Sequence, residues 1–278
     1  MPTVFVRVFQ ELNDHLAPNR RGRRLEVNAA PGETVKAIVE NLGVPHTEIE
    51  LITANGESVP FAHRPADAAE INVYPVFERF DIAGLTRLRD RPLRDPRFEL
   101  DVHLGKLARL LRMCGFDAEY RPPFDDPALI DRALADHRIL LSRDRELLKH
   151  KRLTHGYWLR SLDPWRQLHE VLDRLDLRAR IHPFSRCMSC NGPLEAVSKS
   201  EIAARLLPRT ARYHHEFKRC TRCDKLYWKG SHYERMLARL PASKPAGRND
   251  DWYPDRHPNE NPDSNPAPDP DAHSAADE

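Results

Sequence analysis

The sequence has no long hydrophobic run. Nowhere in its 278 residues do about 18 apolar residues follow one another, which is the length that a membrane-spanning helix needs. The first residues enter a strand pattern directly, without the basic and apolar segments of a secretory signal. These two absences predict a cytoplasmic protein that has no membrane partner.

Cysteine is scarce as well, and this excludes a dense disulfide framework. In the reducing cytoplasm thiols stay free or bind metals, and disulfides are rare. Four of the five cysteines form two pairs with the same spacing, Cys187/Cys190 and Cys220/Cys223. The fifth, Cys114, falls in register with leucines on one predicted helix face, so we expect a buried apolar residue rather than a reactive thiol.

The paired cysteines have the spacing of a structural zinc site. A Cys-x-x-Cys turn presents two sulfurs from one tight knuckle, and a second knuckle completes a tetrahedron with bonds of roughly 2.3 Å. Four unrelated cysteines or two disulfides are the alternative interpretation. Four thiolates leave no open coordination position, so this Zn²⁺ is predicted to hold a small ribbon together, and any chemistry must lie elsewhere.

Positive charge is concentrated around these cysteines. The net charge is +2, but residues 180–240 carry 13 Lys and Arg against 5 Asp and Glu, whereas residues 1–179 carry 28 of each sign. A cationic segment predicts a polyanionic partner, with RNA or DNA as the first candidate and a solvated basic face as the alternative. Residues 241–278 contain eight prolines and few large apolar residues, which predicts a disordered tail.

The N-terminal region has the pattern of a small mixed sheet. Residues 3–9 and 25–27 read as a hairpin, and Thr34 and Gly43 are suited to begin and end a helix. An Asn55-Gly56 turn then precedes a last strand over residues 71–77. This order of elements resembles the β-grasp fold of ubiquitin and of the ThiS and MoaD sulfur carriers.

The resemblance does not extend to the chemistry of those carriers. They act through a free C-terminal Gly-Gly, whereas here the chain continues beyond Phe77 without a diglycine. Sulfur-carrier function is therefore not expected. A docking module for a protein partner is the expected role, and a structural appendage is the alternative. The arginine- and proline-rich residues 80–96 that follow predict a linker.

Residues 97–180 alternate between strand and helix patterns, which predicts an α/β domain with a parallel sheet. Asp101 and Asp144 follow two of the predicted strands, and Asp126 is expected to be the N-cap of a helix beginning at Pro127. Sites in such sheets form at the carboxyl ends of the strands. Carboxylates gathered there bind Mg²⁺ or Mn²⁺, whose waters attack phosphodiesters. The alternative is that each aspartate only caps a helix.

A helix is also predicted directly after Asp101. It runs from Val102 to Cys114, and its polar side is expected to carry three cations. These are Lys106, Arg109 and Arg112.

Longer motifs connect this region with the cysteines. They read Asp-x-x-Leu-Gly-Lys-Leu-Ala-Arg-x-Leu-Arg over 101–112, Gly-Phe-Asp over 115–117, Arg-Ile-Leu-Leu-Ser-Arg-Asp-Arg-Glu-Leu over 138–147, Arg-Cys-Met-Ser-Cys-Asn over 186–191, Cys-Thr-Arg-Cys over 220–223 and Tyr-Trp-Lys-Gly-Ser-His over 227–232. Together they resemble the PIN-like ribonuclease family named for the C-terminal domain of the Mut-seven exonuclease. Its members append a zinc ribbon, and bacterial ones often carry a ubiquitin-like N-terminal domain. The resemblance covers residues 1–240.

The resemblance implies a metal-dependent ribonuclease with a defined set of acidic residues. They map to Asp101, Asp126 and Asp144, and Asp163 is the candidate for a fourth, although a capping role for it is favoured. Histidines are assigned no role at the zinc site; they are His103, His214, His215 and His232. Candidates for contact with RNA, against solvated charge or ribbon packing as alternatives, are Arg143, Arg145, Tyr227, Trp228 and Lys229.

Two functions follow from these observations. The favoured one is a metal-dependent ribonuclease that hydrolyses RNA phosphodiester bonds, with the ribbon aiding RNA binding. The other is a non-catalytic RNA-binding adaptor, in which the aspartates are helix caps. The predicted organisation is a ubiquitin-like β-grasp domain over 1–79, a linker over 80–96, a PIN-like nuclease domain over 97–180, a zinc ribbon over 181–240 and a tail over 241–278.

Overall fold

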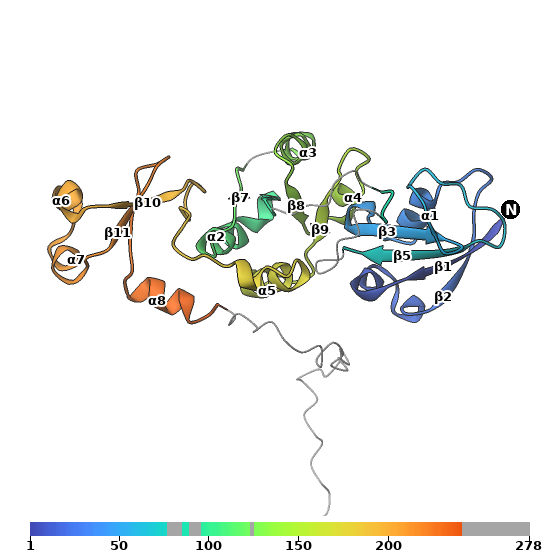
Figure 1. The fold of residues 1–278 in the computed structure, drawn as a ribbon, viewed down its shortest axis with the longest axis horizontal. Coiled ribbons are helices and arrows are strands. Elements are labelled where there is room, and N and C mark those ends of the chain that lie inside the picture. Colours follow the sequence, from blue (N-terminus) through green and yellow to red (C-terminus); the bar gives the residue numbers. More distant parts are fainter. Residues whose placement is uncertain (77–84, 89–95, 123–124, 241–278) are drawn as a thin grey trace, which may run out of the picture. The chain divides into compact units, whose positions relative to one another are not determined.

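The structure is a computed structural model that describes residues 1–76, 85–88, 96–122 and 125–240. These residues all fall within one compact unit, Met1–Ser243. The described residues form three separate sheets (Figure 1). Most of the predicted linker and all of the predicted tail lie outside the described residues, and the predicted domain boundaries stay predictions. No helix in the described ranges is long and apolar enough to cross a membrane.

The first sheet has the topology of a β-grasp fold. Its strand order is β2-β1-β5-β3-β4, and the central pair, β1 and β5, is parallel while the other pairs are antiparallel. The elements are β1 (Thr3–Val8), η1 (Gln10–His15), η2 (Pro18–Arg20), β2 (Arg24–Asn28), α1 (Val35–Asn41), η3 (His46–Glu48), β3 (Ile49–Ala54), β4 (Glu57–Ser58) and β5 (Glu70–Pro75). The predicted β-grasp fold is confirmed.

Local signals account for the ends of these elements. The Thr34 hydroxyl accepts a hydrogen bond from the N–H of Ala37 at 3.3 Å and so begins α1. Gly43 has a φ of +103°, which favours glycine after a helix. Asn55 and Gly56 have φ values of 50° and 88°, as a tight hairpin turn requires. Each of these local predictions is confirmed.

The second sheet is parallel throughout, as predicted. Its order is β7-β6-β8-β9. The elements of this region are β6 (Phe98–Leu100), η4 (Val102–Leu104), α2 (Gly105–Met113), β7 (Ala118–Glu119), α3 (Asp126–Ala135), β8 (Ile139–Ser142), α4 (Arg145–Leu148), β9 (Gly156–Trp158), α5 (Pro164–Arg174) and η5 (Arg178–Arg180).

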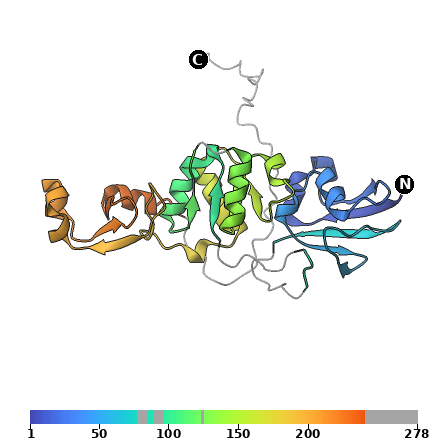
Figure 2. The same cartoon turned by 90° about the horizontal axis from the view of Figure 1, so that it is seen from above.

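Helices cover both faces of the parallel sheet (Figures 1 and 2). Successive residues of a strand point to opposite faces, so β8 is apolar on both. Its Leu141 packs with Leu111 of α2 and Leu168 of α5 on one face, and its Leu140 packs with Ile130 of α3 on the other. Cys114 lies fully buried in the first of these cores, and burial raises its pKa to about 12, as expected for an unreactive thiol.

The first and second sheets meet through buried polar contacts. Glu48 accepts a hydrogen bond from the backbone N–H of Trp158 at 2.7 Å, and its other carboxylate oxygen lies 3.0 Å from Nε2 of His15. The Thr47 hydroxyl donates to the carbonyl of Leu148 at 3.1 Å. Because Trp158 belongs to the edge strand β9, residues of the β-grasp fold satisfy part of the open edge of the parallel sheet.

The third sheet is a small antiparallel ribbon with the order β10-β11-β12. The first cysteine pair precedes β10, and the second spans the end of β11 and the turn after it. Several short helices, for which no prediction was made from the sequence, lie between the two pairs. The elements are β10 (Leu194–Val197), α6 (Lys199–Ile202), η6 (Ala203–Arg205), α7 (Pro208–Tyr213), β11 (Phe217–Cys220), β12 (Leu226–Trp228) and α8 (Ser231–Leu237).

Candidate active site and metal centre

Asp101 and Asp144 lie at the carboxyl ends of β6 and β8, which are neighbours in the parallel sheet. Asp101 is half-buried, whereas Asp144 is exposed. Oδ1 of Asp101 accepts from the N–H of Val102 at 2.5 Å, and Oδ1 of Asp144 accepts from the N–H of Glu146 at 2.8 Å. Both carboxylates therefore cap the helices that follow them, as the capping alternative predicts.

Ser142 connects these two strand ends. Its hydroxyl donates to Oδ2 of Asp101 at 2.8 Å and accepts from the N–H of Asp144 at 2.9 Å, and its side chain is fully buried. Ser142 was not among the predicted site residues. The signal in the sequence is a polar residue that ends the apolar run of β8 two positions before an aspartate.

Asp126 does not have the capping role that the sequence predicted for it. The N-cap of α3 is Asp125, whose Oδ1 accepts from the N–H of Ala128 at 3.0 Å. Asp126 is instead the first helical residue, and it is exposed. Two aspartates, Asp125 and Asp126, precede Pro127, and the sequence does not distinguish them as caps. The predicted N-cap, Asp126, is wrong by one residue.

The three predicted acidic ligands do not form one compact cluster. Within the described ranges, the only group of three or more His, Cys, Asp or Glu side chains placed to hold one metal ion is the cysteine group, whose ligand atoms lie within 4.8 Å of one another. Asp163, the candidate for a fourth acidic residue, caps α5 and accepts from the N–H groups of Trp165 and Arg166 at 3.1 and 2.9 Å. What the structure brings together at the sheet edge is Asp101, Ser142 and Asp144.

Exposed basic side chains lie near both aspartates in the sequence. Arg143 and Arg145 flank Asp144 and are exposed, as are Lys106 and Arg109 on α2. The exposed cations can contact phosphates, which is the usual way a protein positions a nucleic acid.

Arg112 was predicted on the same polar helix side, and this prediction is wrong. Arg112 is buried: Nε donates to the carbonyl of Ala118 at 2.7 Å, and Nη1 donates to the carbonyls of Met188 and Ser189 at 3.2 and 3.0 Å. A buried guanidinium needs hydrogen-bond acceptors. Two of them come from the turn over residues 187–190, the first cysteine knuckle.

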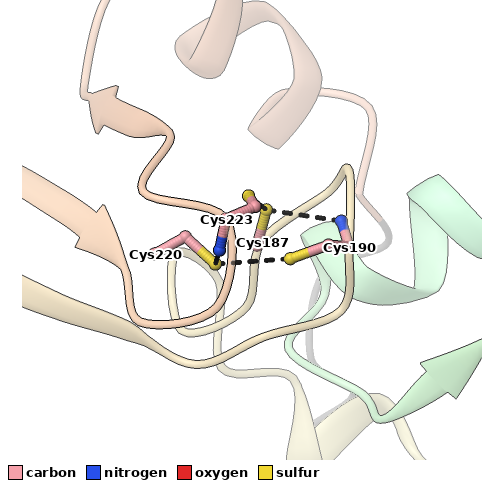
Figure 3. A group of neighbouring side chains, drawn as sticks. All are labelled: Cys187, Cys190, Cys220 and Cys223. Carbon is pink, nitrogen blue, oxygen red and sulfur yellow. Dashed lines mark hydrogen bonds between the residues drawn. The ribbon is translucent and has the colours of Figure 1, made fainter.

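The four cysteine sulfurs converge as a metal site requires (Figure 3). Sγ of Cys187 lies 3.6 Å from that of Cys223, and Sγ of Cys190 lies 3.4 Å from that of Cys220. All four cysteines are free thiols, which excludes the disulfide alternative in this structure. Tetrahedral Zn²⁺ with bonds of 2.3 Å has sulfurs about 3.8 Å apart. The cluster therefore fits a metal ion such as zinc.

Backbone and side-chain donors point at these sulfurs. Burial opposes ionisation of Cys187, but hydrogen bonds from the Tyr227 hydroxyl and from backbone amides outweigh it and lower its pKa to about 7. Burial and the neighbouring sulfurs raise the pKa of Cys190 to about 12. Crowded thiols cannot all ionise without a cation, and a divalent metal ion relieves this conflict.

The three RNA-contact candidates of the ribbon have different surroundings. The hydroxyl of Tyr227 lies 3.1 Å from Sγ of Cys187, and its ring packs on the cysteine cluster, so the packing alternative holds for this residue. Lys229 pairs with Glu216 at 2.6 Å. Trp228, in contrast, is 37% exposed and lines a hollow of about 320 Å³.

Asn191 fastens the first cysteine knuckle to the parallel sheet. Its side-chain nitrogen donates to Asp117 at 2.7 Å and to Glu119 at 3.1 Å, and its side-chain oxygen accepts from the N–H of Ala118 at 3.1 Å. Asn191 is buried and has a φ of 67°. Asn191 was not among the predicted site residues, although an asparagine directly after a Cys-x-x-Cys turn is suited to this left-handed conformation.

Comparison with known families assigns both parts of the chain. The model of the Mut7-C RNAse domain matches residues 96–240, which include the parallel sheet and the ribbon. The model of the Mut7-C ubiquitin domain matches residues 1–81, which include the β-grasp sheet. No curated protein and no solved structure matches the sequence.

Proposed function

Since this chain belongs to the Mut7-C RNase domain family, and so carries the domain of a nuclease, we propose that it hydrolyses RNA phosphodiester bonds at the carboxyl edge of its parallel sheet. The observation that carries this proposal is the connection of Asp101 and Asp144 through the Ser142 hydroxyl at the ends of adjacent strands. This is the edge at which α/β sheets place their sites.

The proposed site binds Mg²⁺ or Mn²⁺ through Asp101 and Asp144, and Asp126, which the structure does not gather with them, is retained from the sequence as a proposed further ligand. Carboxylate oxygens are the ligands these cations prefer, and one or two are enough because the cations retain waters. A bound divalent cation supplies an activated water and neutralises negative charge on the phosphate. Asp163 stays the candidate for a fourth acid, but its two capping hydrogen bonds favour a structural role.

The side chains around the aspartates have separate tasks in this proposal. Ser142 positions Asp101 by donating to one carboxylate oxygen. Arg143 and Arg145, exposed on either side of Asp144, bind phosphates of the RNA backbone.

The cysteine cluster is proposed to hold a structural Zn²⁺. Its four sulfurs leave no open position for substrate, so this ion stabilises the ribbon, which aids RNA binding. A protein partner for the ubiquitin-like region and a cytoplasmic location stay predictions from the sequence.

Asp101→Asn and Asp144→Asn test the proposal in the full chain purified with zinc. Each variant should cleave labelled single-stranded RNA on the order of a hundredfold more slowly in Mg²⁺ or Mn²⁺, because metal-ion catalysis contributes several kcal/mol. Asp126→Asn should also be slower. Asp125→Asn is the matched control: asparagine caps helices as well as aspartate does, so its activity should be normal. Equal cleavage by the wild type, Asp101→Asn and Asp144→Asn would refute the site.

An RNA-binding adaptor is the second candidate. The capping hydrogen bonds of Asp101 and Asp144 favour it, as does the lack of a three-carboxylate cluster among the residues that the structure describes. Purified protein that binds RNA with a steep salt dependence, yet cleaves none with either cation, would support the adaptor over the nuclease.

A further inference from the structure

A hollow lies on the ribbon beside Trp228. It has a volume of about 320 Å³ and is formed by β12 and by the helical segment between β10 and β11. Its apolar lining comes from leucines together with the indole, and two cations, Arg205 and Lys225, also line it. Among the described residues, Leu207 and Trp228 of this lining remain 73% and 37% exposed.

The indole of Trp228 is held in place by the ribbon. Its ring centroid lies 6.5 Å from that of Phe217 on the adjacent strand and 6.3 Å from that of His214. A Cβ atom at Gly230 would lie 3.2 Å from its Nε1, so the chain turns back close to the ring. A ring positioned in this way and still exposed offers a stacking surface at little entropic cost.

The cations of the hollow are also positioned. Nη1 of Arg205 donates to Asp224 at 2.8 Å, and Nη2 donates to the carbonyl of the same residue at 2.7 Å, while the side chain stays 44% exposed. Nζ of Lys225 donates to the Ser189 hydroxyl at 2.9 Å. Residues 198–230 carry nine Lys and Arg against three Asp and Glu. An exposed indole beside two cations fits a ligand that has a flat aromatic group next to a negative charge.

We propose that the hollow receives an unpaired base of single-stranded RNA, which stacks on Trp228 while Arg205 and Lys225 contact the adjacent phosphates. Bases in a duplex are stacked on one another and cannot enter, so the site selects single-stranded segments. This inference rests on the proposed function, for which it names the form of the substrate. Trp228 acts here as a binding residue, and it is separate from the carboxylate edge.

Binding of a labelled, unstructured oligoribonucleotide to the full, zinc-loaded chain tests the proposal, without added Mg²⁺ or Mn²⁺. Stacking on an aromatic ring contributes about 1–3 kcal/mol per base, so Trp228→Ala should weaken binding about 5-fold to 150-fold. Trp228→Phe should keep most of the affinity. The matched control is Tyr213→Ala, which removes a 67% exposed ring of the same segment that does not line the hollow, and it should bind as the wild type does.

A second variant keeps the test valid if Trp228→Ala loses zinc or fails to fold. Thr210→Trp fills the hollow from α7 and leaves Trp228 in place, and it should weaken binding to a similar degree. Zinc content and thermal melting establish that each variant is folded. Single-stranded RNA should also quench tryptophan emission in the wild type, and this quenching should decrease in Trp228→Phe.

An oligonucleotide with abasic sites separates stacking from charge. It keeps the phosphates, so it should bind more weakly than intact RNA and should not distinguish the wild type from Trp228→Ala. Normal RNA binding by folded Thr210→Trp and Trp228→Ala would overturn the proposal and would leave the hollow to another ligand, such as an apolar protein segment. That result does not affect the nuclease, which is judged by cleavage in Asp101→Asn; likewise, a failure to cleave RNA leaves this binding test intact.

Discussion

Ser142 has both of its hydrogen-bonding functions in use at the candidate site. As a buried hydroxyl it donates to Asp101 and accepts from the backbone of Asp144, so it holds two strand ends in one arrangement. Removing a buried hydroxyl lowers the free energy of unfolding by more than the net contribution of its hydrogen bonds, because the buried partners are left unsatisfied.

Ser142→Ala should therefore be less stable by about 1–3 kcal/mol and, under the proposed function, cleave RNA more slowly. The mutation leaves Oδ2 of Asp101 without its donor and the N–H of Asp144 without its acceptor. Urea unfolding and cleavage rates measure the two effects. Ser142→Thr restores the hydroxyl and should recover activity; if Ser142→Ala cleaved normally, the hydroxyl would have no positioning role.

At the scale of elements, η3 supplies a hydrogen-bond acceptor to the edge strand β9. The backbone N–H of Trp158 has a buried carboxylate, that of Glu48, as its partner. Burial alone would raise the pKa of the Glu48 carboxyl, but the hydrogen bond and charge of His15 and the charge of Arg160 outweigh it, so the pKa lies below its ordinary value. The ionised form of Glu48 is thus favoured in the folded protein.

The sign of this shift predicts a pH dependence of stability. A carboxyl whose pKa is lowered on folding stabilises the protein above its unfolded pKa of about 4.3, and this contribution is lost as the pH falls through the folded pKa. Glu48→Gln should be less stable by about 2 kcal/mol at neutral pH and lose less stability than the wild type below about pH 4. Melting temperatures across this range measure both. Glu26→Gln, at an exposed strand position, is the control.

At the scale of the whole molecule, the cysteine cluster and the parallel sheet are parts of one hydrogen-bonded assembly. Asn191 and Arg112 connect the first knuckle to β7 and to its neighbouring helix. Arg222, from the second knuckle, donates to Glu119 at 3.2 Å. The cysteine cluster therefore supports the edge of the parallel sheet as well as the ribbon.

Under the proposed structural role of Zn²⁺, its removal should affect both parts. A chelator should make residues 181–240 sensitive to protease, because a closed four-cysteine site contributes folding energy directly. It should also increase hydrogen exchange at Ala118 and Glu119, while the exchange of the β-grasp sheet changes little. Mass spectrometry of exchange measures both regions, and re-addition of Zn²⁺ is the control. Unchanged exchange at β7 would show that the knuckle docks without supporting the sheet.

The sequence by itself determined the features that depend on neighbours along the chain. Helix and turn signals such as Thr34 and Asn55-Gly56, the apolar run of β8 and the spacing of the cysteines each act over a few residues. Their outcome was therefore predictable, and so were the β-grasp fold and the parallel sheet, because the order of elements admits few topologies.

Only the tertiary structure decided which distant residues meet. Arg112 is buried where carbonyl groups of the first cysteine knuckle accept its hydrogen bonds. Asn191 contacts β7 because the same packing places the knuckle beside that strand. The connection made by Ser142 and the hollow beside Trp228 also depend on elements that are far apart in sequence. The residues that are neighbours along the chain set the local conformation, whereas the burial and the hydrogen-bond partners of a side chain depend on how the elements pack.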